Sequence, residues 1–373
     1  MIKKIVFIST SNSSINVFLK KLISSLINQK IQVSVITNSI PVNKNRIKNV
    51  KYYKINLHRK INFIYDFISL ILFFKLLFIL KPDLSVSITP KAGLINSIVT
   101  KIFKTKSIHF FTGQVWYNKK NFYRFFLKFL DLLTFKLISY PFADSISQIN
   151  FLKGEGFLSK NITLINNGSI CGVDTIKFKK SDNYNKLLRQ QLSIDTYSTV
   201  IGYIGRLSNE KGTILLLNAF KKLCTNNNNL TLLLVGLDED SILDLVSKNF
   251  SDLNIKYFNF TNEPENYYKI IDIFCIPSYR EGFGLSAIEA SASNVPVVAS
   301  KIVGLEDSIK DGISGILFEN GNLHDLINKL ESLIASPDLS KSLGLNGRKR
   351  VLKYFKEKEV INFLSKSIIK IIN

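Results

Sequence analysis

Two glycines and two glutamates stand together after an apolar run, in the stretch that covers residues 277–300. A predicted strand over residues 271–276 leads into a turn with Glu281, Gly282 and Gly284, and a predicted helix carrying Glu289 follows. Glycines let backbone N–H groups approach a ligand closely, and a helix N-terminus carries partial positive charge, so this turn suits a phosphate. Carboxylates accept hydrogen bonds, so Glu281 and Glu289 are candidates for binding the hydroxyls of a sugar or ribose.

A second turn, about 75 residues earlier, supplies positive charge. Residues 202–212 read GYIGRLSNEKG and close one predicted strand before a predicted helix, with Arg206 and Lys211 five positions apart. The planar fork of an arginine and the compact charge of a lysine are complementary anchors for a diphosphate. Either residue alone would more often be structural or solvated, but the two motifs together favour a nucleotide site.

The two motifs resemble those of the retaining glycosyltransferases of family 4, which have the GT-B fold. The resemblance is strong over the second half of the chain and weak over the first. The family pattern E-G-F-G-L-x-x-x-E-A is matched by Glu281, Gly282, Phe283, Gly284, Leu285, Glu289 and Ala290, and the pattern G-R-x-x-x-x-K-G by Gly205, Arg206, Lys211 and Gly212.

The resemblance implies that a sugar moves from a nucleotide-diphosphate sugar to a hydroxyl with retention at the anomeric carbon. Arg206 and Lys211 would hold the pyrophosphate and stabilise its developing charge, so they are expected to be catalytic together with Glu281. Glu281 would contact hydroxyls of the donor sugar, and Glu289 those of the ribose. We expect a hexosyltransferase with no cofactor besides the co-substrate and no metal, because cations can replace a metal ion at a diphosphate. The expected donor-binding residues are Gly205, Gly282, Phe283, Gly284, Leu285 and Glu289.

Alternating strands and helices predict an α/β protein with two Rossmann-like doubly wound parallel sheets, which in the GT-B fold face a central cleft. We place an acceptor-binding domain at residues 1–178 and a nucleotide-sugar-binding domain at 179–355, with a polar linker over 179–185. By analogy with the fold, the helix from about 356 to 373 is expected to pack back on the first domain.

Three turns of the first half follow predicted strands, and ligands of such sheets gather at the carboxyl ends of strands. These turns cover residues 10–14, 89–93 and 112–116. Many family members have a glycine pair in the first turn and a histidine at the third, where this chain has serines and Thr112. His109 is expected to be a buried structural imidazole. The candidate acceptor or cleft residues are Ser13, Ser14, Lys91, Thr112, Gly113 and Gln114.

Positive charge is concentrated in the first half of the chain. Residues 1–178 contain 26 Lys and Arg against 6 Asp and Glu, whereas the remainder contains 24 against 22. This asymmetry indicates an anionic partner for the first domain, and we expect a membrane surface. The predicted helix over 121–139 is basic and aromatic, and membrane contact and ordinary packing are equally good interpretations of it. Nucleic acid is not expected, because no recognised binding module is present.

Other segments give simpler expectations. The first ten residues are interpreted as a buried strand and not as a signal peptide. The apolar run over 61–80 is interrupted by Asp66 and Lys75, so we expect a largely buried amphipathic helix in preference to a transmembrane one. Cys171, Cys224 and Cys275 match no metal spacing and are expected to be reduced, structural thiols.

The sequence therefore predicts a bacterial glycosyltransferase that extends a lipid-linked saccharide during capsule, O-antigen or lipopolysaccharide synthesis. We expect it in the cytoplasm, peripherally associated with the inner face of the plasma membrane. A nucleotide-sugar 2-epimerase of the same fold is an alternative, although the chain has only three histidines for the histidine-rich cleft that this activity needs. A surface-binding protein for membranes or nucleic acids, with a degenerate site, is a further alternative that the intact motif residues disfavour.

Overall fold

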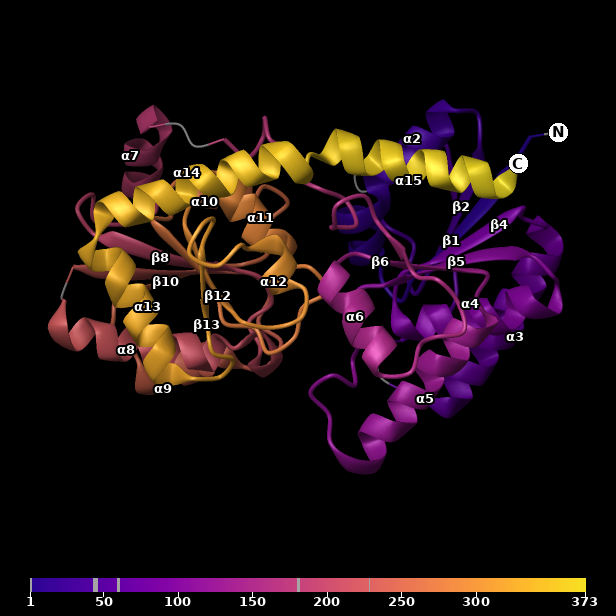
Figure 1. The fold of residues 1–373 in the computed structure, drawn as a ribbon, viewed down its shortest axis with the longest axis horizontal. Helices are drawn as coiled ribbons and strands as arrows, with labels where there is room; N and C mark the ends of the chain where they lie inside the picture. The colour runs from indigo at the N-terminus through magenta and orange to yellow at the C-terminus, as the bar shows by residue number, and fades with distance from the viewer. Residues whose placement is uncertain (1, 43–45, 59–60, 180–181, 228) are drawn as a thin grey trace. The chain divides into compact units, whose positions relative to one another are not determined.

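The computed structural model describes residues 2–42, 46–58, 61–179, 182–227 and 229–373 (Figure 1). The chain forms two compact units, one from residues 1–172 with 358–373 and one from residues 173–357. Part of the linker predicted over 179–185 lies outside the described residues, and a helix begins at Asp182.

The first unit is a seven-stranded parallel sheet with helices on both faces. Its order is β3-β2-β1-β4-β5-β6-β7. The strands are β1 (Lys4–Ile8), β2 (Gln32–Thr37), β3 (Val50–Lys54), β4 (Leu84–Ser87), β5 (Lys106–Phe111), β6 (Tyr140–Ala143) and β7 (Thr163–Leu164). The helices are α1 (Asn12–Ser14), the π-helix η1 (Ile15–Leu19), α2 (Lys20–Asn28), α3 (Phe63–Leu80), α4 (Pro90–Ile102), α5 (Asn121–Leu137), α6 (Ile146–Gly154) and α15 (Glu357–Ile372).

The second unit repeats this plan with six parallel strands in the order β10-β9-β8-β11-β12-β13. Its strands are β8 (Thr199–Ile204), β9 (Leu230–Val235), β10 (Ile255–Phe258), β11 (Ile273–Ile276), β12 (Val297–Ser300) and β13 (Ile316–Phe318). Its helices are α7 (Asp182–Gln191), the 3-10 helix η3 (Asn209–Lys211), α8 (Thr213–Asn226), α9 (Ile242–Asn249), α10 (Glu265–Tyr268), α11 (Leu285–Ala292), α12 (Leu305–Ser308), α13 (Leu323–Ala335) and α14 (Pro337–Tyr354).

In both sheets the strand order reverses once, at the topological switch point. Ligands of doubly wound sheets bind next to this point. The reversal lies between β1 and β4 in the first unit and between β8 and β11 in the second. At such a point the connections leave toward opposite faces, so a crevice opens outside the carboxyl ends of the two strands. The predicted doubly wound fold is confirmed. Its two switch points indicate that candidate ligand-binding turns follow β1 and β4 in the first unit and β8 and β11 in the second.

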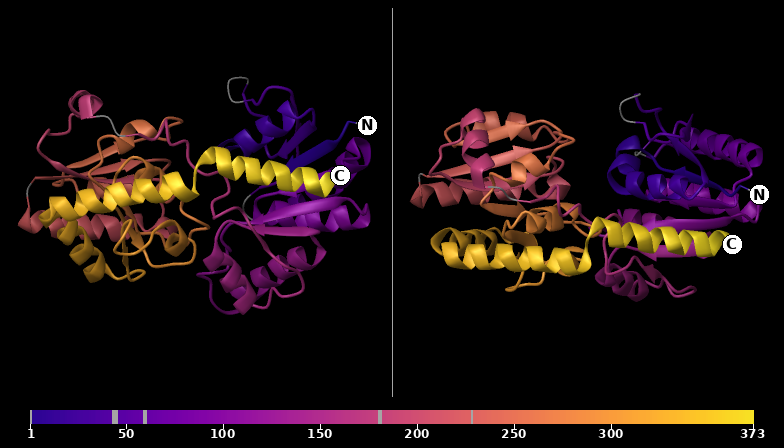
Figure 2. Two further views of the ribbon diagram at one scale, coloured as in Figure 1. Left: turned by 45° about the horizontal axis from the view of Figure 1, so that its top comes forward. Right: turned by 90° about the horizontal axis from the view of Figure 1, so that it is seen from above.

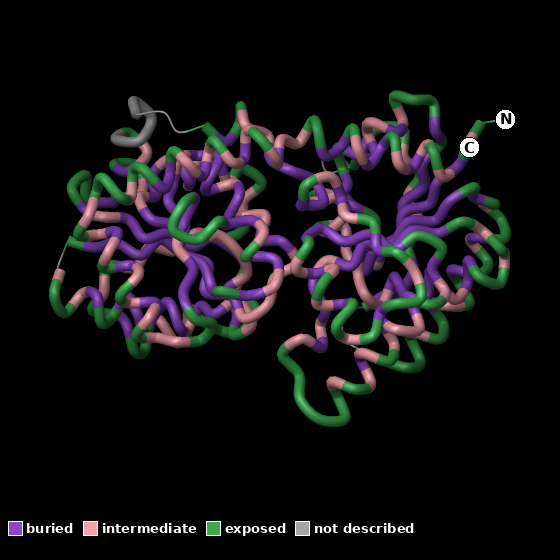
Figure 3. The backbone as a smooth tube through the Cα atoms, in the orientation of Figure 1, coloured by how far each residue is buried: buried purple, intermediate pink, exposed green. Residues whose placement is uncertain are grey.

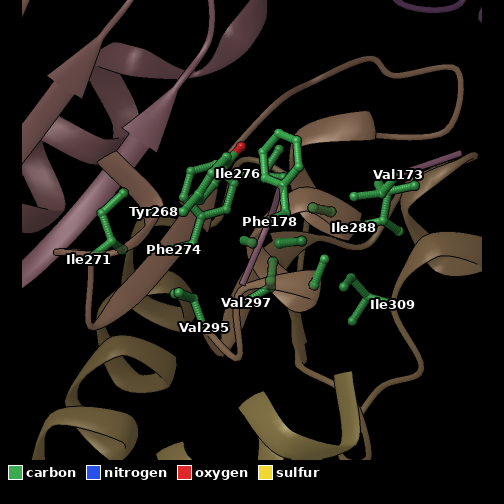
Figure 4. Packing of buried hydrophobic residues seen from close by; sticks show 14 of the residues in the cluster. Val173, Phe178, Tyr268, Ile271, Phe274, Ile276, Ile288, Val295, Val297 and Ile309 are labelled. Atoms are coloured by element: carbon green, nitrogen blue, oxygen red, sulfur yellow. The ribbon is translucent and has the colours of Figure 1, made fainter. Parts of the chain in front are cut away.

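Both sheets are buried between helical layers, as the burial colouring of Figure 3 shows for the strands. In the second unit one core layer joins the sheet to α11 and α14, and another joins it to α8, α9 and α13. The first layer is aromatic at its centre, where Tyr268 meets Phe274 and Phe178 with ring centroids 5.2 and 5.7 Å away (Figure 4). This core layer supports β11 and α11, which flank the turn that carries Glu281.

The compact units divide at Gly172, six residues before the boundary expected after Phe178. The intervening segment is held by the second unit. The N–H of Val173 donates to the carbonyl oxygen of Phe355 at 2.8 Å, and Phe178 is buried in the second unit's core. Residues 173–178 therefore pack with the second unit.

Helix α15 belongs to the first unit, although the chain reaches it from the second (Figures 1 and 2). The Nζ of Lys3 donates to the carbonyl oxygen of Ile372 at 2.7 Å, and the amide of Gln29 donates to the hydroxyl of Ser365 at 2.7 Å. Val360, Leu364 and Ile368 on its inner side are fully or almost fully buried.

The expectation that residues 61–80 form a largely buried helix is wrong. Helix α3 is long and apolar enough to cross a membrane, with mean hydropathy 2.3, but only 17% of it is buried, and no other helix in the described part of the chain has this character. Only Ser69, Phe73 and Leu77 are buried. The reason is that α3 packs on the unit along a single strip centred on Phe73 and Leu77, so that many of its other apolar side chains stay exposed.

Candidate functional site

The two motif turns lie side by side at the switch point of the second unit. Strand β8 delivers Gly205, Arg206 and the following residues, and β11, its hydrogen-bonded neighbour, delivers Pro277 to Gly284. The N–H of Tyr279 donates to the carbonyl oxygen of Glu210 at 3.0 Å, so the two turns touch through their backbones.

Glycine makes this approach possible. Gly212 has φ +70°, and a Cβ placed on it would lie 1.9 Å from the carbonyl oxygen of Pro277. Gly236, which follows β9, similarly leaves room for the backbone of Gly205. A Cβ on Gly236 would lie 1.8 Å from the carbonyl oxygen of Gly205. Any side chain at these positions would push the turns apart.

Lys211 and Glu281 form an ion pair that joins the two turns. The Nζ of Lys211 lies 2.6 Å from Oε1 of Glu281, and both side chains are mostly buried. Oε1 of Glu281 also accepts a hydrogen bond from the Ser278 hydroxyl at 2.9 Å. The residue predicted to hold phosphate and the residue predicted to hold sugar hydroxyls are therefore within one site.

Arg206 is about one-third exposed and belongs to a second charged cluster. Its guanidinium is ion-paired with Glu239 and lies 4.0 Å from Oε1 of Glu210. That same oxygen lies 2.5 Å from Nη2 of Arg280. Three neighbouring cations, Arg280 first, lower the pKa of Glu210 and outweigh the burial that would raise it. In this site Arg206, Arg280 and Lys211 are each ion-paired with a carboxylate, and a diphosphate could take the place of these carboxylates.

Glu289 lies one turn into α11, in a less polar setting. Its Oε2 accepts a hydrogen bond from the Tyr268 hydroxyl at 3.0 Å. Burial raises the pKa of Glu289 to about 7, the Tyr268 hydrogen bond lowers it, and the nearby Glu265 raises it again. Near neutral pH this carboxyl can therefore accept or donate hydrogen bonds.

The glycine-bearing turn ends at Gly284, which has φ +82° and precedes α11. The ring of Phe283 is buried and packs edge-on against Phe355, with centroids 5.2 Å apart. Its side chain is therefore a core element, and only its backbone remains for the donor contact predicted from sequence. Leu285, the first residue of α11, is half-buried.

The candidate residues of the first unit surround its own switch point. Ser13 is exposed in α1, and the Ser14 hydroxyl lies 2.9 Å from that of Ser11. The N–H of Thr10 donates to the Thr89 hydroxyl at 3.0 Å, which ties the turns after β1 and β4. Lys91, at the start of α4, is ion-paired with Asp66 of α3 at 2.7 Å.

The turn after β5, which holds three of the candidate residues, is mostly buried. Gln114 is buried, and its amide oxygen accepts a hydrogen bond from the amide of Gln148. It lines a small internal pocket with Thr112, Gly113 and His109. The side chain of Gln114 is thus engaged inside the unit, while Thr112 is half-buried.

His109 is buried, as expected. Its Nδ1 lies 2.9 Å from the Ser87 hydroxyl, and burial lowers its pKa to about 3. A Cβ on Gly93 would lie 2.4 Å from the imidazole Cε1, so α4 can cross the ring only at a glycine. The imidazole is a neutral packing element of the sheet.

Sequence reasoning missed four polar residues of the second-unit site: Glu210, Glu239, Tyr268 and Arg280. Glu239 and Tyr268 reach the motif residues Arg206 and Glu289 from segments far apart in sequence, and Arg280 of one turn pairs with Glu210 of the other. The charged neighbours of the motifs, Glu210 beside Lys211 and Arg280 beside Glu281, were the available signal. Among the described residues, no cluster of three or more His, Cys, Asp or Glu side chains could hold a metal ion.

The sequence and the fold match known proteins. Residues 185–350 match the family model described as glycosyl transferases group 1. The chain is 31% identical over 294 residues to the capsular polysaccharide biosynthesis glycosyltransferase CapM of Staphylococcus aureus, covering 74% of this chain and 73% of CapM. The chain belongs to the group 1 glycosyl transferases.

Further relatives match over a shorter length. The chain is 33% identical over 190 residues to the lipopolysaccharide 1,2-N-acetylglucosaminetransferase of Salmonella typhimurium, covering 48% of each protein. The alignment thus spans about half the length of this relative.

Solved structures agree with the fold over the whole chain. Sucrose-phosphate synthase from Thermosynechococcus elongatus superimposes with a TM-score of 0.85 at 20% identity, over 99% of this chain and 98% of that one. Anabaena Alr3699/HepE, in complex with UDP and glucose, superimposes with a TM-score of 0.83 at 18% identity, over 98% and 99%. These superpositions agree with the GT-B fold predicted from the sequence.

Proposed function

We propose that the chain is a retaining glycosyltransferase of family 4 that moves a hexosyl group from a nucleotide-diphosphate sugar to a saccharide carried on a lipid. The observation that carries the proposal is the contact between the two motif turns, where Lys211 of one meets Glu281 of the other at 2.6 Å. A diphosphate needs the cations of one turn, and a sugar needs the carboxylate of the other. Only when the turns are in contact can one ligand meet both.

The reaction separates a diphosphate from a sugar that develops positive charge. In the proposed complex, the diphosphate takes over Arg206 and Lys211 from their carboxylates, and these cations stabilise the negative charge as the bond breaks. Glu281, released from Lys211, accepts hydrogen bonds from sugar hydroxyls, and Glu289 accepts those of the ribose. The backbone N–H groups at the start of α11 add positive potential.

The biological setting is also part of the proposal. The likeness to CapM supports capsule synthesis, and the shorter match to a lipopolysaccharide transferase supports a related acceptor, including O-antigen. The positive charge of residues 1–178 fits an enzyme that works peripherally at the inner face of the plasma membrane, on an acceptor with a lipid diphosphate. Nucleic acid is not part of the proposal.

A donor panel tests this proposal. The purified protein is incubated with nucleotide sugars, UDP-sugars first, with and without a lipid-linked acceptor, and release of nucleoside diphosphate is measured. We expect acceptor-dependent release from one donor, and a product whose anomeric configuration, measured by NMR, equals that of the donor. Inversion would refute retention, and conversion of the donor sugar to an epimer without an acceptor would favour an epimerase.

The same assay in EDTA tests the metal requirement. Because arginine and lysine supply the positive charge at the proposed diphosphate site, we expect turnover to be unchanged when divalent cations are chelated. Restoration of a lost activity by added Mg²⁺ or Mn²⁺ would show that the cations of the chain are insufficient.

A further inference from the structure

Helix α3 of the first unit has its apolar side chains on the outside. Successive residues advance by about 100° around a helix, and the buried Ser69, Phe73 and Leu77 form one strip. Asp66 lies beside this strip and pairs with Lys91. The opposite arc, about 200° wide at that spacing, is lined by the exposed residues Phe63, Ile64, Tyr65, Phe67, Ile68, Ile71, Leu72, Phe74, Phe78 and Ile79.

This arrangement reverses the usual one, in which the apolar stripe of a surface helix faces the core and the polar residues face water. Several side chains of the arc are almost fully open, with 75% of Phe63, 73% of Ile64 and 71% of Ile79 exposed. A contiguous apolar surface of this kind marks an interaction site. Ile102, 61% exposed at the end of α4, adds to the surface, because Phe103 beside it packs at a tilt against Phe74 with centroids 4.6 Å apart.

The helix is also fixed to its unit. Phe73 and Leu77 are packed in a core cluster with Val6 and Ile8 of β1. The ion pair between Asp66 and Lys91 holds the N-terminal half. A helix that keeps these contacts cannot cross a bilayer, but its exposed arc, about 27 Å long at 1.5 Å per residue, can lie flat in one surface.

The positive charges around the exposed arc favour an anionic lipid surface as its partner. Lys75 lies within the exposed arc, Lys81 caps the helix, and Lys101 and Lys104 lie at the end of α4, all exposed. Lysines at such positions can lay their stems along apolar chains and place their charges among phosphates. A second copy of this chain, with a net charge of +22, would instead bring the same lysines together.

We propose that α3 inserts into the surface of an anionic phospholipid bilayer, with its exposed arc among the acyl chains and its lysines at the level of the phosphates. The role that we assign to this insertion, which is to bring the enzyme to its lipid-linked acceptor, rests on the proposed function. Because Lys91 stands at the turn after β4 and is paired with α3, insertion would hold this candidate acceptor turn beside the headgroups, where a lipid-linked acceptor carries its phosphates.

Tryptophan reporters test the depth of insertion in the full chain. Phe67→Trp and Phe78→Trp are mixed with vesicles of phosphatidylglycerol and phosphatidylethanolamine whose acyl chains are brominated. We expect strong quenching at both positions. Ile176→Trp, an even more exposed position in the second unit, is the control and is expected to show no more quenching than the buried Trp116 of the unchanged protein. Equal quenching at all positions would overturn the proposal.

A polar variant tests the contribution of the arc to binding. The triple substitution Ile64→Gln, Phe67→Gln and Ile79→Gln is compared with Ile176→Gln, Tyr197→Gln and Ile313→Gln, which alters exposed residues of the second unit. Vesicle flotation in high salt removes the charge contribution and leaves the apolar one. We expect the α3 variant to bind at least about tenfold more weakly, and the control variant to bind like the unchanged protein. Equal binding by both variants would overturn the proposal.

Two further results separate the alternatives. Should the unchanged protein form a dimer that the α3 variant does not form, and fail to float with the vesicles, the arc is covered by a second copy and the proposal is wrong. Vesicle binding uses neither donor nor acceptor. A protein that inserts α3 but transfers no sugar would therefore disprove the proposed function alone, whereas transfer without insertion would disprove this inference alone.

Discussion

At the level of single residues, the cations of the candidate donor site are already engaged. Lys211 is paired with Glu281, and Arg206 with Glu239. Each pair keeps two charges satisfied in a partly buried place, where an unpaired charge would be costly. A diphosphate with two phosphates can replace both carboxylates at once, so the pairs favour a ligand that offers more negative charge than a single carboxylate.

Glu289 gives a pH-dependent prediction. The pKa of this carboxyl is about 7 in the folded protein, against an ordinary value of 4.5. The folded state therefore binds this proton more tightly than the unfolded state does, and the free energy of unfolding should fall as pH rises from about 4.5 to about 7. Glu289→Gln should flatten this part of the stability profile, measured by chemical denaturation at several pH values.

The exposed Glu331→Gln is the matched control and should leave the profile unchanged. The same Glu289 variant should raise the KM for the donor by about tenfold or more, because a charged acceptor of hydrogen bonds is lost at the ribose. In the unchanged protein, KM should fall as pH rises through about 7. A stability profile that Glu289→Gln does not alter would contradict the assigned pKa.

Sequence spacing could predict the motif residues but not their partners. Lys211 and Glu281 were paired as parts of one site because each follows a strand in a recognisable pattern. The ion pair between Glu210 and Arg280 depends on how two turns meet in space, which no local pattern encodes. Phe283 shows a second limit of the motif pattern. The pattern predicts a donor-binding residue at this position, but the side chain is packed in the core.

At the level of elements, the switch point between β8 and β11 brings the two motifs together, and Gly212 sets their distance. Gly212→Ala would place a methyl group against the carbonyl oxygen of Pro277. We expect the turns to separate, with loss of the contact between Lys211 and Glu281 and at least about a tenfold fall in donor turnover.

Gly312→Ala is a well-matched control for this prediction. Gly312 has nearly the same backbone, φ +68°, but a Cβ on it would meet nothing within 4 Å. Both substitutions should cost about 1–2 kcal/mol of stability for the left-handed backbone, and Gly212→Ala should cost more because of its clash with Pro277, measured by denaturation. Only Gly212→Ala should also reduce turnover, and equal turnover in the two variants would show that the approach of the turns is unimportant.

The same level shows why α3 was mispredicted. A run of apolar residues specifies a helix and its hydropathy, but the side that faces the unit depends on which neighbours exist. The two charges in the run suggested an amphipathic helix with a wet face. In the structure one of them, Asp66, pairs with Lys91 beside the packed side, and the apolar side faces outward. The doubly wound plan was predictable, because strands and helices alternate along the whole chain, whereas the order of the strands comes from the structure.

At the level of the whole molecule, the last helix makes the first unit discontinuous in sequence. Ile368 of α15 is completely buried. Ile368→Ala should destabilise the first unit by about 2–5 kcal/mol through lost packing and the resulting cavity. Native-state hydrogen exchange should show this as reduced protection of β1 and β2, with β8 and β9 unaffected.

Lys366→Ala, at an exposed position on the same helix, should change stability by less than about 0.5 kcal/mol. A loss of protection in β8 and β9 with no change in the first unit would contradict the assignment of α15 to that unit.

The charge-neutralising role of Arg206 and Lys211 is the central claim, and one measurement tests it most directly. Nucleoside diphosphate release is measured at saturating donor for Arg206→Ala, Lys211→Ala and the exposed control Lys222→Ala. We predict that kcat falls about 10²–10³-fold in each of the first two variants, the loss typical of removing one group that stabilises developing charge, and stays unchanged in the control. Turnover at the unchanged rate in both Arg206→Ala and Lys211→Ala would contradict the account.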